Sequence, residues 1–164
     1  MRQLSINVDT ERKCVGAALL KAEETGAPAA AIELSDGRII TGKTSVLLGA
    51  SSALLLNAIK AIAGIDEKRE IISPEILEPI QTLKTKHLGN HNPRLHTDEV
   101  LIALAVTAAK SKDARRALEA VEELKGTEVH STVILSEVDT GVFRKLGVNL
   151  SCEPKYQTKK LFHR

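Results

Sequence analysis

Hydrophobic and polar residues alternate near the start of the chain and then recur at helical spacing. Between residues 4 and 8, leucine, isoleucine and valine alternate with polar side chains, a pattern that predicts a short strand. Asp9 or Thr10 then caps a predicted helix in which apolar residues recur three and four positions apart. We predict that Gly26 ends this helix, because glycine readily adopts the left-handed backbone found at helix ends.

The next two hydrophobic runs predict a β-hairpin followed by a buried helix. Residues 29–34 and 38–41 are β-prone, and the Asp-Gly pair between them suits the positive φ of a tight turn. Residues 49–63 are apolar on nearly every side, which predicts a helix that is buried on more than one face and ends at Gly64.

Four helices and two strands are predicted in the remainder of the chain. In order, they are a helix opened by Ser73 and Pro74 that Pro79 kinks or shortens, a helix from Asp98 to about Lys110 capped by Thr97, a helix from about Asp113 to Leu124, a strand from Thr127 to Leu135, a helix from Glu137 to Leu146, and a strand from Val148 to Cys152. The full order predicts a single α/β domain over residues 1–164, with helices on both faces of a sheet.

The composition narrows the functional classes. The chain of 164 residues is 27% charged and 43% hydrophobic, which excludes disorder as a description of the whole. No apolar run approaches the roughly 20 residues of a membrane span, and the first residues lack the apolar core of a signal peptide. We therefore expect a cytoplasmic protein. The sequence has no tryptophan, which argues against a base-stacking surface for single-stranded nucleic acid.

Basic and aromatic residues concentrate at the carboxy-terminal end. Residues 154–164 contain three lysines, one arginine and no acid, which gives them +4, although the whole chain has a net charge of only +2. The other 153 residues therefore carry −2, which does not suit binding to nucleic acid. All three aromatic residues lie within the last 22 positions. We predict that residues 154–164 form a basic docking tail anchored by Tyr156 and Phe162, and that its partner is a second copy or a separately encoded protein.

One stretch matches a phosphate-binding motif letter for letter. Residues 37–44 fit the GxxxxGK[ST] pattern, in which backbone N–H groups surround phosphates and the lysine reaches the outer phosphates. Its loop positions are Arg-Ile-Ile-Thr, and these side chains favour a hairpin strand that leads to a turn at Gly42. A narrower prediction remains, because Lys43, Thr44 and Ser45 precede the buried helix, whose first N–H groups suit an anion.

Histidine and acidic residues gather in two later segments without forming a standard metal motif. Gly89 and Pro93 interrupt any helix that would align the first histidines, so we predict neither a metal site nor a cofactor. Cys14 and Cys152 lack a CxxC spacing, and we predict that both are reduced residues of the interior. The members of this group are His87, His91, His96, Asp98, Glu99, Glu128 and His130.

Two parts of this group are candidate functional residues. Glu128 and His130 lie on one face of a predicted strand, where they would act as acid and base or form a satisfied internal hydrogen bond. Arg94 lies close to His96 in the sequence, and a phosphate or carboxylate would suit these two side chains together with Lys43. Nothing in the sequence places the two parts within reach of each other.

Four long stretches of the chain resemble one bacterial protein family. They are AIELSDGRIITGKTS, NPRLHTDEVLIAL, EVHSTVILSEVD and FRKLGVNLSCEPKYQTKKLFH. Through them, residues 28–164 are similar to the carboxy-terminal part of the uncharacterised family called domain of unknown function 1846. The resemblance implies a three-layer α/β/α sandwich of the cytidine-deaminase type with a helical insertion in the middle.

The resemblance does not imply deamination. Zinc deaminases use an HxE motif and a distant PCxxC, whereas this chain has His96-Thr97-Asp98 and no paired cysteines. Members of the family are longer and carry further domains before this one, so the chain is either a stand-alone version or a fragment. The family has no established activity to carry over, and whether this chain is an enzyme stays open.

We therefore expect a domain that binds a small anionic ligand, such as a nucleotide or another phosphorylated compound. Arg94 and Lys43 would hold the anion, His130 would act as acid or base, and Glu128 would orient it. Two alternatives stay open, a non-catalytic domain for oligomerisation or subunit assembly and a metal-dependent hydrolase. The residues assigned are His130, Glu128 and His96 for catalysis, and Lys43, Thr44, Ser45, Arg94 and Asp98 for ligand binding.

Overall fold

A mixed four-stranded sheet organises the computed structural model, which describes residues 13–154. Its strands are β1 (Ala29–Glu33), β2 (Ile39–Lys43), β3 (Glu128–Ser131) and β4 (Asn149–Cys152). Their order is β2-β1-β3-β4, with β1 antiparallel to both β2 and β3, and β3 parallel to β4. Consequently β2, β3 and β4 all end at the same edge of the sheet.

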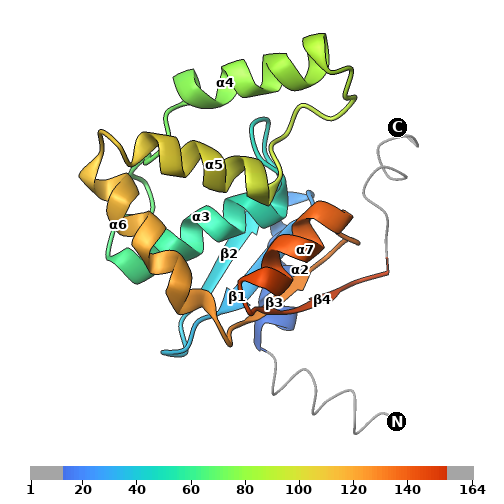
Figure 1. The fold of residues 1–164 in the computed structure, drawn as a ribbon. Helices are drawn as coiled ribbons and strands as arrows, with labels where there is room; N and C mark the ends of the chain where they lie inside the picture. Colours follow the sequence, from blue (N-terminus) through green and yellow to red (C-terminus); the bar gives the residue numbers. More distant parts are fainter. Residues whose placement is uncertain (1–12, 155–164) are drawn as a thin grey trace, which may run out of the picture.

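Helices lie on both faces of this sheet. Those in the described residues are α2 (Lys13–Thr25), α3 (Ala50–Ala63), α4 (Pro74–Thr82), α5 (Thr97–Thr107), α6 (Lys112–Ala120) and α7 (Glu137–Lys145), with a π-helix η1 (Leu83–His87) and a 3₁₀-helix η2 (Val121–Leu124). Figure 1 shows α3 and α7 in front of the sheet, with α5 and α6 packed on α3. None of the described helices is long and apolar enough to cross a membrane.

Alternating residues of β1 belong to two separate cores. Ala31 packs with Cys14 and Ala18 of α2 on one face of the sheet. Its neighbours Ala30 and Ile32 belong to the main core on the other face, together with the leucines of α3. The period of two along a strand therefore divides the apolar residues of β1 between the two faces.

The predicted hairpin and the predicted helices on either side of it are confirmed within residues 13–154. Ile32 of β1 lies opposite Ile40 of β2, and Gly37 in the connecting turn has a φ of 91°. The buried helix ends at Gly64, whose φ is 75°. The predicted strand at residues 4–8 and all but the first residue of the basic segment 154–164 lie outside the described residues.

Gly42 lies where β2 and α3 approach each other closely. A Cβ atom at this position would lie 2.3 Å from the backbone nitrogen of Leu54 and 2.6 Å from its Cα atom. Within the phosphate-loop match, Ile39–Lys43 are therefore strand residues held against a helix, as the hairpin interpretation predicts. The predicted turn at Gly42 is wrong, because Gly42 pairs with Ala30 inside β2.

α4 and η1 together form an arm, residues 74–87, at the top of Figure 1. The sequence predicts that Pro79 kinks or shortens this helix. Shortening is not observed, because α4 continues past Pro79 to Thr82 and then as a π-helix to the end of the arm. Leu77 and Lys84 are the buried residues of the arm, so few buried side chains attach it to the rest of the fold.

Three other predicted elements need correction. The predicted strand 127–135 stops at Ser131, because the Ser131 hydroxyl contacts both backbone polar groups of Val133 and the chain turns there. Thr97 is the first residue of α5 and does not cap it; the capping position belongs to His96. The predicted helix ending at Leu124 divides into α6 and η2.

Candidate functional site

A cavity of about 450 Å³ lies among the amino-terminal ends of α3, α5 and α7. α3 follows β2 and α7 follows β3, and both strands end at the same edge of the sheet. Open α/β sheets bind ligands at this edge, beyond the carboxyl ends of their strands. The lining consists of Gly49, Ala50, Ser51, Asn92, Arg94, Leu95, His96, residues 133–137 and Asp139.

A buried carboxylate joins the three helix ends. The Asp139 side chain accepts a hydrogen bond from Ser51 Oγ at 2.9 Å. It also accepts hydrogen bonds from the backbone N–H of Thr97 at 2.9 Å and from Thr97 Oγ1 at 2.7 Å. Asp139 is only 6% exposed, so its charge is compensated by these donors and by the positive end of α5.

The two helices α3 and α7 both begin at the cavity, but they differ in how their first turns are capped. Ser136 caps α7 by accepting a hydrogen bond from the Asp139 N–H at 3.2 Å. α3 begins after Gly49 and has no side-chain cap. The first N–H groups of a helix have no partner within the helix. The residues that carry them in α3, Ala50 and Ser51, line the cavity, so this helix end suits an anion.

Residues 92–96 form the wall that carries Arg94 and His96. Arg94 Nε donates a hydrogen bond to the carbonyl oxygen of Ser45 at 2.5 Å. The carbonyl oxygen of Leu95 accepts from Ser52 Oγ of α3 at 2.8 Å, and Leu95 forms a parallel bridge with Leu48. These contacts tie the wall to the loop between β2 and α3, so Arg94 is held at the cavity by two segments.

Behind this wall lies a network around Glu99. Its Oε1 atom accepts a hydrogen bond from the His96 backbone N–H at 2.7 Å and contacts the Lys84 ammonium at 2.9 Å. Burial raises the pKa of Glu99, but these hydrogen bonds and the charges of Lys84 and His96 outweigh it and hold the pKa below its ordinary value. Glu99 therefore remains an anion that orients the backbone of His96.

Two of the predicted site residues, Arg94 and His96, lie at the cavity. The other predicted binding residues do not line it. Lys43 is exposed at the end of β2, and Asp98 lies in the first turn of α5. Thr44 and Ser45 lie outside the cavity lining. The Thr44 N–H donates to the carbonyl oxygen of Pro28, and the carbonyl oxygen of Ser45 accepts from Arg94.

The predicted pair of Glu128 and His130 lies away from this cavity. His130 is opposite Ala31, on the face of the sheet that α2 covers, and is 4% exposed. Its Nδ1 atom lies 2.6 Å from Ser151 Oγ and its Nε2 atom 2.8 Å from a carboxylate oxygen of Glu153. The acidic partner of this histidine is thus Glu153, while Glu128 accepts a hydrogen bond from Asn149.

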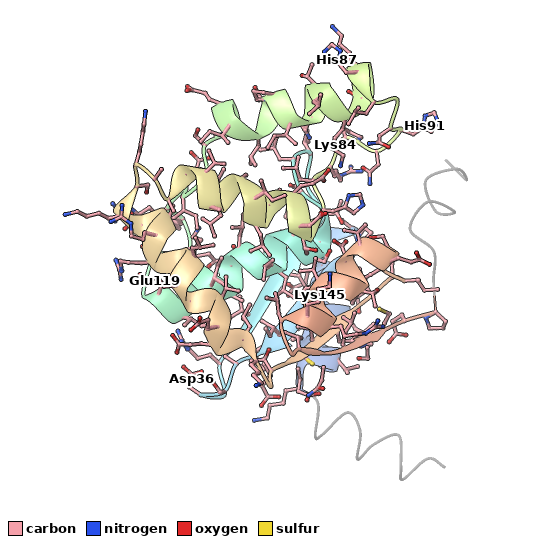
Figure 2. All side chains as sticks on the ribbon, viewed as in Figure 1. Asp36, Lys84, His87, His91, Glu119 and Lys145 are labelled. Carbon is pink, nitrogen blue, oxygen red and sulfur yellow. The ribbon has the colours of Figure 1, made fainter. Side chains whose placement is uncertain are left out.

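The remaining histidines and the cysteines lie in separate places. Figure 2 shows His87 and His91 at the outer end of the arm, and both are exposed. Within residues 13–154, no three His, Cys, Asp or Glu side chains are grouped so that they could hold a metal ion. Cys14 is buried and Cys152 is half-buried, and burial raises the pKa of the Cys152 thiol.

Ser51 and Asp139 are site residues that the sequence analysis missed. The sequence carries a signal for the second, because Ser136 and Asp139 have the spacing of a helix cap. Ser51 is a hydroxyl in the first turn of an otherwise apolar helix. Neither signal pairs the two residues, which are 88 positions apart.

Comparison with known proteins extends over nearly the whole chain. The family model described as Domain of unknown function DUF1846, C-terminal, matches residues 10–162. UPF0371 proteins of Corynebacterium efficiens and Corynebacterium glutamicum are 61% and 59% identical over 94% of this chain, and one of Streptococcus thermophilus is 52% identical over 100%. The matches cover 31% of both corynebacterial proteins and 33% of the streptococcal one, so the chain spans about a third of the length of these curated relatives.

Proposed function

This chain belongs to the family of domain of unknown function DUF1846, and on that premise we propose that the cavity among α3, α5 and α7 binds a small anionic ligand. The ligand class is a nucleotide or another phosphorylated metabolite. The family is one of unknown function, so the proposal depends on the geometry of the cavity.

One observation carries this proposal: the uncapped start of α3 and the guanidinium of Arg94 line the same cavity. The helix dipole gives the start of α3 a partial positive charge, and its first N–H groups are donors for phosphate oxygens. An arginine presents several N–H donors in a plane, which suits phosphate or carboxylate oxygens. Together they form an anion site with donors from two directions.

The rest of the lining suits the other parts of such a ligand. Asp139 is already bonded to Ser51 and Thr97, so its charge is compensated within the protein. Residues 133–135 add an apolar wall of valine, isoleucine and leucine beside the polar helix ends. A volume of about 450 Å³ lies within the range of small-molecule sites, roughly 300–1,000 Å³. A phosphate at α3 would therefore leave room for a sugar or base.

A thermal-shift screen with nucleotides and sugar phosphates tests the proposal. We expect at least one compound to raise the melting temperature of the wild-type protein, and Arg94→Gln to weaken its binding about tenfold, the loss of one charge-assisted hydrogen bond. Arg144→Gln is the matched control, because Arg144 lies in the last turn of α7 and outside the cavity lining. A screen in which no phosphorylated compound stabilises the protein would contradict the proposal.

We also propose that the fold is the three-layer sandwich of the cytidine-deaminase type. Support comes from the β1–β2 hairpin that leads into the buried helix α3, and from helices on both faces of the sheet. The arm and α5 would then be the helical insertion in its middle. Superposition of an experimental structure on a cytidine deaminase tests this, and a different strand order in that superposition would contradict it.

A second candidate function is assembly with another polypeptide. Ile102 and Val106, one turn apart on α5, are 62% and 66% exposed, which leaves apolar surface uncovered in this chain. The occupant would be the remaining two-thirds of the longer family proteins or a second copy. Light scattering on the chain with and without residues 154–164 tests this function. A monomer in both forms that also fails to bind the amino-terminal part of a relative would contradict it.

A further inference from the structure

We infer that the arm formed by α4 and η1 is coupled to the cavity through Lys84, so that ligand binding and docking of the arm stabilise each other. This inference rests on the proposed function, because it concerns the regulation of the same site. Its starting observation is a buried lysine on a π-helix with no other buried residue: Lys84 is 4% exposed, whereas Lys86, two positions later, is exposed.

Lys84 binds the wall of the cavity from behind. Its Nζ atom donates to the carbonyl oxygen of Arg94 at 2.7 Å and to Glu99 Oε1 at 2.9 Å. The same Glu99 oxygen accepts from the His96 backbone N–H at 2.7 Å. One ammonium group of the arm therefore fixes, directly or through Glu99, the backbone of both Arg94 and His96, which line the cavity.

The π-helix gives this lysine its position. The N–H of Leu88 donates to the carbonyl oxygen of Leu83 at 2.9 Å, a bond that spans five residues and closes the wide turn. Single π turns inside or after α-helices often mark functional sites. Figure 2 shows Lys84 on the side of the arm that faces the rest of the fold, whereas His87 lies at its outer end.

The arm has few other buried attachments. Within residues 74–87, Leu77 is the other buried side chain, and Ile76 and Ile80 are partly buried. A segment with few buried contacts opens at low free energy. An ammonium without partners in the interior is also unfavourable, so the docked arm needs Arg94 and Glu99 in place. Docking of the arm and order in the cavity wall thus require each other.

Thermodynamic linkage turns this requirement into coupling. A ligand that needs Arg94 and His96 in their observed places binds better to the form in which the arm is docked. Binding then shifts the population toward the docked arm, and by reciprocity anything that displaces the arm weakens the ligand. A partner that binds the arm would in this way regulate the cavity without touching it.

Hydrogen exchange measured by mass spectrometry, with inorganic phosphate as the probe, tests this inference on the full chain. In the wild-type protein we expect phosphate to slow exchange at residues 49–52 of the site and, at least threefold, at residues 74–87 of the arm. Lys84→Met should lose the phosphate-dependent protection of the arm and bind phosphate about tenfold more weakly. Lys86→Met, which removes the same charge from the same turn, is the matched control and should behave as the wild type.

The outcomes separate coupling from a merely structural lysine. If Lys84 only stabilises the arm, Lys84→Met speeds its exchange equally with and without phosphate, which overturns the inference. Protection of the site without protection of the arm in the wild type also overturns it, and this result does not depend on whether Lys84→Met folds. If phosphate protects neither region of the wild-type protein, the proposed function fails and the coupling fails with it.

Discussion

The two sides of the sheet carry buried polar clusters that differ in construction. On the α2 side, His130 contacts Ser151, its register partner on the adjacent strand, and Glu153, which follows that strand. On the α3 side, Asp139 contacts Ser51 and Thr97, which lie 88 and 42 positions away on two other helices. Strand pairing alone assembles the first cluster, whereas the second forms only where three helix ends meet.

This difference distinguishes a buried cluster whose polar groups are hydrogen-bonded within the protein from a cluster that borders a cavity. The His130 cluster uses both ring nitrogens within the protein and adds nothing to the lining of the cavity. The Asp139 cluster also satisfies its own polar groups, but the three helix ends it joins enclose a cavity beside Arg94. Burial of a titratable side chain is therefore a weaker sign of function than the meeting of distant elements around a cavity.

Gly42→Ala tests how closely the α3 side is packed and has the largest expected effect. The added Cβ would lie 2.3 Å from the backbone nitrogen of Leu54, and no side-chain rotation relieves that contact. We expect the free energy of unfolding to fall by about 3 kcal/mol in urea denaturation. Gly16→Ala on the α2 side is the control, because no atom beyond its chain neighbours and the backbone of its own helix lies within 4 Å of the added Cβ. It should raise the free energy of unfolding by about 0.5–1 kcal/mol. Equal changes in the two variants would contradict the closer packing on the α3 side.

Asp139→Asn tests the cluster at the cavity. The amide keeps one acceptor oxygen but turns a donor toward Ser51 or Thr97, so buried donors lose their charged partner. We expect a loss of about 2 kcal/mol in the free energy of unfolding, as for hydrogen bonds to charged groups. Denaturation of Asp139→Asn and Ser51→Ala together should show a loss smaller than the sum of the two, because the residues share a hydrogen bond. Additive losses in the free energy of unfolding would contradict the hydrogen bond between Asp139 and Ser51.

His130→Gln tests the cluster on the α2 side. Glutamine can reach one of the two partners, Ser151 or Glu153, and the partner it releases is half-buried and can bind water. We expect a loss of about 1 kcal/mol, smaller than for Asp139→Asn. Binding of a phosphorylated ligand should not change, since His130 lies outside the cavity lining. Weaker ligand binding in this variant would contradict this expectation and would show that the two clusters are functionally coupled.

The smallest expected effect is a pH dependence at Glu99. Its pKa in the folded protein lies below the ordinary value of 4.5, so its contribution to stability is present above that value. The contribution is lost as the pH falls through the folded-state pKa. Glu99→Gln should therefore destabilise the protein at neutral pH and approach the wild type in acid. The same substitution in a Lys84→Met background should show a weaker pH dependence, and an unchanged one would exclude Lys84 as a cause.

Local patterns predicted most of the fold. Gly37 and Gly64 mark the hairpin turn and the end of α3, because their backbone conformations are ones that other residues rarely adopt. The strand after Thr127 was predicted too long, because its β-prone run continues past Ser131 while the Ser131 side chain bonds to the backbone and turns the chain. The resemblance to the family was equally visible in the sequence, and the match over residues 10–162 confirms it.

The residues of the candidate site also fall into two groups, those that local sequence patterns predict and those that they do not. Arg94 and His96 were recognisable because a cation and an imidazole lie two positions apart next to a predicted helix start. Ser51, Asp139 and Lys84 were not, because each acquires its role from a partner in another helix or loop. Glu128 shares a predicted strand face with His130, yet the adjacent strand supplies the acid that His130 contacts.

By itself, the sequence determined the hairpin, the buried helix with its end at Gly64, and the family, since each depends on residues close together in the chain. The tertiary structure decided which polar residues meet: Asp139 with Ser51 and Thr97, and Lys84 with Arg94 and Glu99. The physical reason is that periodicity and capping act within about one helical turn. A cavity between three helix ends depends on how the sheet edge brings those ends together.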